Sequence, residues 1–111
     1  MSTVTNAQLS NSAGAIATGT SPKNRNLLSV KFFNTSTTAD QTITLYHYPS
    51  GGSATDTTTV DEKAIGPREV YVLPKDQLVV LGNGDVFAGK STDAATVTVT
   101  VNYIDRGTDN N

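Results

Sequence analysis

Polar and apolar residues alternate with a period of two along most of this chain, which is typical of half-buried β-strands. The pattern is clearest between Gln41 and Tyr48. One side of that segment carries Ile43, Leu45 and His47, and the other carries Thr42, Thr44, Tyr46 and Tyr48. Turn-forming residues bound the segment, with Asn34 and a Ser/Thr run before it and Pro49-Ser50-Gly51-Gly52 after it.

The rest of the chain supplies further predicted strands. They cover residues 27–33, 60–65, 68–73, 78–81, 85–90 and 96–104. We expect residues 27–33 and 41–48 to pair as an antiparallel hairpin, and Asn83-Gly84 to close a second hairpin, because both of its residues tolerate positive φ. In the first strand, Leu28, Val30 and Phe32 share the predicted buried side. Residues 78–81 are apolar on both sides, so they are predicted to lie between layers.

Seven or eight short strands separated by turns predict two packed antiparallel sheets. The expected fold class is all-β, a single antiparallel β-sandwich of jelly-roll or immunoglobulin-like type, with an extended N-terminal arm. The composition agrees, since the 111 residues include 18 threonines and suffice for one domain. The chain has no cysteine, so packing, backbone hydrogen bonds or association must stabilise it.

Apolar residues are distributed unevenly between the ends and the body of the chain. Residues 1–26 hold Leu9 and Ile16 as almost their only large apolar side chains. We expect either an edge strand followed by a loop, or an arm that becomes ordered on a neighbouring subunit. Residues 27–105 form the predicted sandwich domain, and residues 106–111 are polar and predicted to be a disordered tail.

Charge and hydropathy narrow the classes of partner. The formal net charge is −2, and the eight Lys and Arg residues are scattered, so we expect no nucleic-acid binding. The N-terminal residues lack the basic and apolar regions of a secretion signal, and no apolar run is long enough to span a bilayer. We therefore expect no membrane association.

One segment matches a known phosphate-binding motif. Residues 84–91, GDVFAGKS, fit the pattern G-x-x-x-x-G-K-[ST]. The working motif needs a helix that begins at its Ser or Thr and points its N-terminus at the phosphate. Here an alternating Thr/Val strand follows Ser91. We therefore predict a strand with Lys90 near its end, and neither a nucleotide site nor a cofactor.

Other candidates for catalysis or metal binding are isolated. His47 is the single histidine and has no cysteine partners for zinc and no recognisable Ser/Asp triad. Asp61 and Glu62 are adjacent in a strand, so their side chains should point to opposite faces. We expect no catalytic residue and no metal ligand, and the protein is predicted not to be an enzyme.

Six residues are candidates for an interface. Leu9 and Ile16 belong to the N-terminal segment that could lie on a neighbour. Lys23 and Arg25 could meet an acidic surface, or equally well be the charges that keep a loop soluble. Tyr46 and Tyr48 share a strand side, where they could stack on a sugar, dock a protein or pack structurally. The structural role is favoured for this tyrosine pair.

Several of these segments resemble a family of small β-sandwich virion proteins of tailed bacteriophages. The first are Asn34-Thr35-Ser36, residues 42–46 (TITLY) and residues 49–53 (PSGGS). In family order there follow residues 69–73, the Gly84-Asp85 turn, residues 88–91 and residues 97–101. The resemblance covers residues 27–104. His47 departs from it, because the family usually has an aliphatic residue there.

The resemblance implies a head decoration (cement) protein, made in the host cytoplasm and located on the outer capsid surface of the virion. It would bind the major capsid protein and copies of itself, with a homotrimer as one candidate because shells offer three-fold positions. The alternative is a small tail, neck or fibre component with a glycan-binding face at Tyr46 and Tyr48. That alternative requires at least one of the two tyrosines to be exposed.

Overall fold

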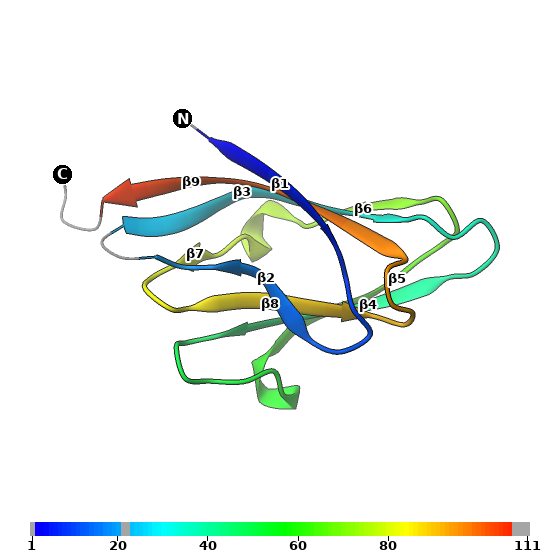
Figure 1. Ribbon diagram of the computed structural model, residues 1–111, viewed down its shortest axis with the longest axis horizontal. Coiled ribbons are helices and arrows are strands. Elements are labelled where there is room, and N and C mark those ends of the chain that lie inside the picture. Colours follow the sequence, from blue (N-terminus) through cyan, green and yellow to red (C-terminus); the bar gives the residue numbers. More distant parts are fainter. Residues whose placement is uncertain (1, 21–22, 108–111) are drawn as a thin grey trace.

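The computed structural model describes residues 2–20 and 23–107, which form two antiparallel sheets packed face to face (Figure 1). Sheet A has the order β1 (Thr3–Gln8), β9 (Val97–Gly107), β3 (Lys23–Asn34) and β6 (Val70–Val72), with β7 (Val80–Leu81) also paired to β3. Sheet B has the order β2 (Gly14–Thr18), β8 (Val86–Ser91), β4 (Gln41–Tyr48) and β5 (Thr59–Ile65). Two 3₁₀ helices, η1 (Asp56–Thr58) and η2 (Lys75–Gln77), lie in the connections. The predicted all-β sandwich is confirmed.

The inner faces of the two sheets share one apolar core. Alternation decides which side chains enter it: in β9, Val97, Val99 and Val101 are buried, whereas Thr98 and Thr100 between them are partly exposed. Sheet A and its adjoining residues contribute Leu27, Val30, Phe32, Leu73, Leu81, Val97, Val99 and Val101. Sheet B and the β1–β2 connection contribute Leu9, Ala17, Ile43, Leu45, Ile65 and Phe87.

The longest pairing in the fold joins β3 to β9. Its register runs from Lys23 opposite Gly107 to Asn34 opposite Val97, and a bulge interrupts it between Leu27 and Ser29. Because a bulge inserts one extra residue, it turns Leu27 into the core and leaves Leu28 outside. The prediction that Leu28 shares the buried side with Val30 is therefore wrong.

The two predicted hairpins are also wrong. β3 lies in sheet A and β4 in sheet B, where β4 pairs with β5 and β8. Residues 35–40 thus carry the chain from one sheet to the other, which lets Phe32 and Ile43 enter the core from opposite sides. The Asn83-Gly84 turn likewise joins β7 in sheet A to β8 in sheet B. Residues 78–81 do not lie between layers, because Val80 is exposed and only Leu81 is fully buried.

A buried amide holds the corner where the chain leaves β3. Asn34 Nδ2 donates to the carbonyl oxygens of Ala39 (2.9 Å), Ile65 (3.0 Å) and Gly66 (3.1 Å). Its Oδ1 accepts the backbone N–H of Ser36 at 2.9 Å. The side chain therefore links the end of a sheet A strand to the end of β5 in sheet B, and satisfies backbone groups that burial would otherwise leave unpaired.

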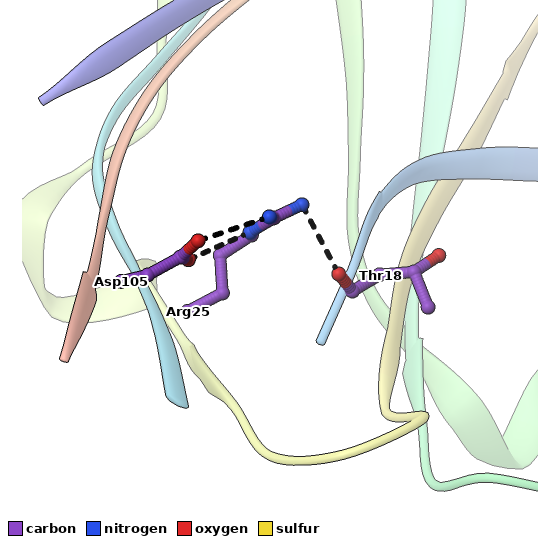
Figure 2. A network of polar contacts seen from close by, with 3 residues as sticks. All are labelled: Thr18, Arg25 and Asp105. Atoms are coloured by element: carbon purple, nitrogen blue, oxygen red, sulfur yellow. Dashed lines mark hydrogen bonds and ion pairs between the residues drawn. The ribbon is translucent and has the colours of Figure 1, made fainter. Parts of the chain in front are cut away.

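An ion pair fastens the opposite end of β3 (Figure 2). Arg25 binds both carboxylate oxygens of Asp105, with Nε to Oδ1 at 2.9 Å and Nη2 to Oδ2 at 3.1 Å. Its Nη1 donates to the carbonyl of Thr18 in sheet B at 3.3 Å, and the guanidinium lies 4.0 Å from the ring centroid of Tyr103. The hydrogen bonds to Arg25 lower the pKa of Asp105, and those to Asp105 raise the pKa of Arg25.

The N-terminal segment supplies an edge strand to each sheet. β1 pairs with β9, and β2 pairs with β8. Leu9 lies between them in the core, where its backbone N–H bonds the carbonyl of Val97 at 2.9 Å. The segment therefore forms an edge strand in each sheet and the start of β3, where we predicted either one edge strand followed by a loop or an extended arm. At the other end of the chain β9 continues through Gly107, and the remainder of the predicted tail, residues 108–111, lies outside the described residues.

We predict that Asn34→Asp destabilises the fold by about 3 kcal/mol or more, because a carboxylate cannot donate to the three carbonyl oxygens that surround it. Urea unfolding at neutral pH measures the free energy of unfolding. Asn83→Asp, in an exposed turn, is the matched control and should change that free energy by less than about 0.5 kcal/mol. Equal effects of the two variants would show that the Asn34 amide does not hold the corner.

Candidate interaction surface

Strand β6 presents two valines to the outside of the sandwich. Val70 and Val72 lie opposite Phe33 and Lys31 of β3. Between them, Tyr71 turns inward and stacks on Phe32, with ring centroids 6.2 Å apart. The inward aromatic ring therefore anchors a strand of only three residues and directs both valines outward.

Other exposed aliphatic side chains lie on the same outer side of sheet A. Val80 of β7 pairs across from Asn26, Val4 of β1 pairs across from Asn102, and Leu28 projects at the β3 bulge. We call this surface the valine face, and it comprises Val4, Leu28, Val70, Val72 and Val80, which are 44–58% exposed. Among the described residues, the one other large aliphatic side chain with such exposure is Val60 in β5. Five such side chains on one outer face make it a candidate interaction surface.

The charged side chains at outward positions of the sheet A strands are basic. Lys31 lies at its centre, and Arg106 faces outward near the end of β9. Arg68 lies over the ring of Phe33 at 4.8 Å and donates to the carbonyl of Thr35 at 3.3 Å. No carboxylate occupies an outward position on the described strands of sheet A. The face is therefore suited to a partner that is apolar with acidic groups.

The outer face of sheet B has a different character. Thr42, Thr44, Glu62 and Lys90 line a shallow hollow of about 280 Å³, together with residues near the β8 end. Thr44 Oγ1 donates to Glu62 at 3.3 Å. This side of the molecule is polar and carries both signs of charge, so it offers little apolar area to a partner.

Tyr46 is covered by the protein itself. It is 7% exposed and lies across from Ala88, which is fully buried, and neither belongs to the central core. The connection that contains η1 lies close to β4. Tyr48, at the strand end, is half-buried. Tyr46 is therefore not available for stacking on a ligand, whereas Tyr48 keeps part of its surface exposed at the strand end.

The remaining candidate interface residues are divided between core, groove and surface. Leu9 lies in the core, and Ile16 is half-buried in a groove between β1 and β2. Arg25 is held by Asp105 in the network of Figure 2, whereas Lys23 is exposed at the start of β3. The structure thus does not bring these residues together with Tyr46 and Tyr48 into one surface.

The phosphate-loop match forms a strand, not a loop. Residues 86–91 are β8, paired with β2 on one side and β4 on the other, so their backbone N–H groups belong to the sheet. A phosphate-loop helix is absent from residues 2–20 and 23–107. His47 is half-buried opposite Phe87 at the end of β4. In the same described ranges, no three His, Asp or Glu side chains gather as a metal site.

The valine face was not identified from the sequence. The alternation did place Val70 and Val72 on one side of their strand, opposite Tyr71. It could not show which side is buried, because both sides are apolar and the partner strand is far away in sequence. Leu28 was obscured by the bulge, which no residue in the segment signals. The signal that the sequence did offer was a pair of valines that alternate with Tyr71 close to Arg68.

A contact between the sheets fixes β6 in place beneath this face. Tyr71 Oη donates to Asp61 Oδ2 of β5 at 2.8 Å, and the ammonium of Lys63 lies 5.7 Å from the Tyr71 ring centroid. Burial, then the hydrogen bond to Asp61 and its negative charge, raise the pKa of Tyr71 to about 12. Asp61 thus points inward while Glu62 points outward to Thr44, so the two carboxylates diverge as expected.

We predict that Tyr71 ionises near pH 12 in the folded protein and that Asp61→Asn lowers the pKa of Tyr71. Since the folded pKa exceeds the unfolded value of about 10, the contribution to stability is complete below pH 10 and disappears as pH rises towards 12. Tyrosinate absorbance against pH measures the ionisation. Tyr71→Phe, which keeps the ring on Phe32, should remove the late step. A late step that persists in Tyr71→Phe would refute the assignment.

No helix among the described residues is long and apolar enough to cross a membrane. Comparisons of the chain with protein-family models, curated proteins and solved structures find no match.

Proposed function

We infer that this protein is a non-enzymatic structural protein of a tailed bacteriophage virion, of the head decoration (cement) type. It binds the outer capsid surface through the valine face and stabilises the shell. The observation that carries this proposal is the clustering of exposed aliphatic side chains with basic neighbours on the outer side of sheet A. The resemblance of residues 27–104 to phage decoration proteins supplies the class of partner, the major capsid protein.

The size of the valine face suits a weak contact repeated many times. The 32 residues of β1, β9, β3 and β6, with a rise of about 3.3 Å per residue and a strand spacing of about 4.8 Å, cover roughly 500 Å². A stable protein interface buries about 800 Å² on each partner. One copy alone would therefore bind weakly, whereas copies that contact each other across shell subunits would add their contributions. A protein that binds only the assembled shell stabilises that state by mass action.

The distribution of charge indicates which side of the protein would face the capsid. The chain as a whole carries a formal charge of −2, yet the valine face carries Lys31, Arg68 and Arg106. An acidic patch on the capsid exterior would attract this face more than the polar side, where Glu62 and Lys90 have opposite charges. Because these charges are at the surface, binding should weaken as salt concentration rises.

The N-terminal strands change how this proposal is tested. Removal of residues 1–26 would delete β1, β2 and part of β3, and would take Leu9 and Ala17 out of the core. Such a truncation is expected to disrupt the sandwich, so lost binding would be uninformative. Single substitutions at exposed positions keep the fold and separate binding from stability.

We predict that Val72→Glu weakens binding to phage heads stripped of this protein at least about tenfold, because it places a negative charge beside Lys31 in the apolar area. Co-sedimentation of purified protein with the stripped heads measures the affinity. Isolated tails are assayed in parallel. Saturable binding of the unmodified protein to heads, with a higher melting temperature of the decorated shells, is the expected result.

The matched control is Val60→Glu. Val60 is also an exposed edge-strand valine, but it belongs to β5 in sheet B. It should leave binding to heads unchanged, and both variants should melt near the temperature of the unmodified protein. Binding to tails or to neither particle would overturn the decoration proposal. Equal loss in both variants would overturn the assignment to the valine face.

A further inference from the structure

One side of the sandwich is formed by two free strand edges. β1 ends sheet A and β2 ends sheet B, each with a single partner strand. The connection between them crosses from sheet to sheet, where the N–H of Ser91 bonds the carbonyl of Ser10 at 3.0 Å. Both free edges therefore lie on the same side of the molecule, which we call the N-terminal edge.

The N-terminal edge carries no charge. The first charged residue of the chain is Lys23, so β1, β2 and their connection are uncharged. The opposite side differs, because β5 carries Asp61, Glu62 and Lys63 and a bulge, and β6 has only three residues. Charges, bulges and short strands are the usual devices that prevent an edge from pairing with another chain. The N-terminal edge has no charged residue, and β1 in addition has no bulge and is not short.

β1 is the more regular of the two free strands. All six of its residues are exposed, and its register with β9 runs without interruption from Thr3 opposite Tyr103 to Gln8 opposite Thr98. It contains neither proline nor glycine. β2, by contrast, has a bulge between Ala15 and Ala17. β1 therefore presents a straight row of backbone donors and acceptors that has no partner strand within the described residues.

A groove lies between the two free strands. It has a volume of about 400 Å³ and is lined by small side chains of β1 and β2, including Ala7, Ala15 and Ala17, with Val101 and Tyr103 behind them. A second hollow of about 120 Å³ continues it and shares Ala7, Ala15 and Ile16. Arg25, which Figure 2 shows bound to Asp105, is also among the groove's lining residues. The groove is thus mostly apolar, and the Arg25 guanidinium that lines it is already paired with Asp105.

We propose that β1 pairs antiparallel with β1 of a second copy of this chain, so that sheet A continues across a two-fold dimer. A two-fold axis perpendicular to the sheet places outward residues opposite outward residues and inward opposite inward. Centred on Thr5, the register sets Val4 against Asn6 and Thr3 against Ala7. Every pair is uncharged, so no charge loses its solvent without a partner. The same axis brings the two apolar grooves together.

A second copy fits this edge better than a charged partner does. A basic or acidic strand would bury its charges against residues that offer none in return. Self-pairing also covers the groove-lining side chains of both copies at once. The dimer would leave both valine faces pointing the same way. The inference does not depend on the proposed function, because it concerns the free protein.

The first test is the mass of the full chain in solution. Sedimentation equilibrium should show reversible association to twice 11.6 kDa. Thr5→Lys should raise the dissociation constant at least about tenfold, because it sets like charges near each other at the centre of the pairing. Ala64→Lys, at an exposed position of edge strand β5, is the matched control and should leave the dissociation constant unchanged.

The second test uses the absence of natural cysteine. Thr5→Cys places a thiol at the centre of the register described above. Asn6→Cys places one at the centre of the adjacent register, in which Asn6 lies opposite Asn6 of the second copy; opposite Cα atoms lie about 4.5–5.5 Å apart in either case. One of them should form a disulfide-linked dimer in air, and Ala64→Cys should not. A monomer at every soluble concentration, or cross-linking no better than that of Ala64→Cys, would overturn the proposal. Association that Thr5→Lys leaves intact would overturn it as well.

Discussion

The whole structure depends on one apolar layer shared by two sheets. Each sheet has a single continuous apolar face, and neither is stable unless that face is covered. Phe32 from sheet A and Phe87 from sheet B are fully buried in this layer, and small β-branched residues such as Val97 and Val99 fill the space around them. With so modest a core and no disulfide, the domain has little stability to lose at its corners.

The shared layer obliges the chain to cross repeatedly between sheets, and each crossing leaves backbone groups that need partners. Asn34 supplies them at the crossing from β3 to β4. Gln41 does the same for the turn after β8, where its amide exchanges two hydrogen bonds with Asp93 at 2.8 and 2.9 Å. Both side chains are almost fully buried. The buried polar residues are thus needed for this topology, because they complete the hydrogen bonding of the connections between the two sheets.

The surfaces of the molecule differ in whether polar or charged side chains discourage contact with another protein. Sheet B is polar on its outer face. On the side where β5 and β6 lie, charged residues are present and the Tyr71 hydroxyl donates a hydrogen bond to Asp61. The outer side of sheet A and the N-terminal edge are left without such protection, the first rich in exposed valine and the second free of charge. These two surfaces meet at β1, since Val4 lies on one and the strand's backbone edge forms the other. Contacts with a capsid and with a second copy could therefore coexist.

The sequence by itself determined the fold class and most strand positions, because alternation is local: Ile43 and Leu45, or Val97 and Val99, face the core as the period of two requires. It also favoured a strand over a phosphate loop at residues 84–91, since strand residues follow where a helix is needed, and residues 86–91 are strand β8. The strand partners, the Leu27–Ser29 bulge and the exposed valines were decided by the tertiary structure. Turn residues at 34–40 and 83–84 are compatible with either a hairpin or a crossing between sheets. The choice depends on which distant strands can cover an apolar face, and that information is not local.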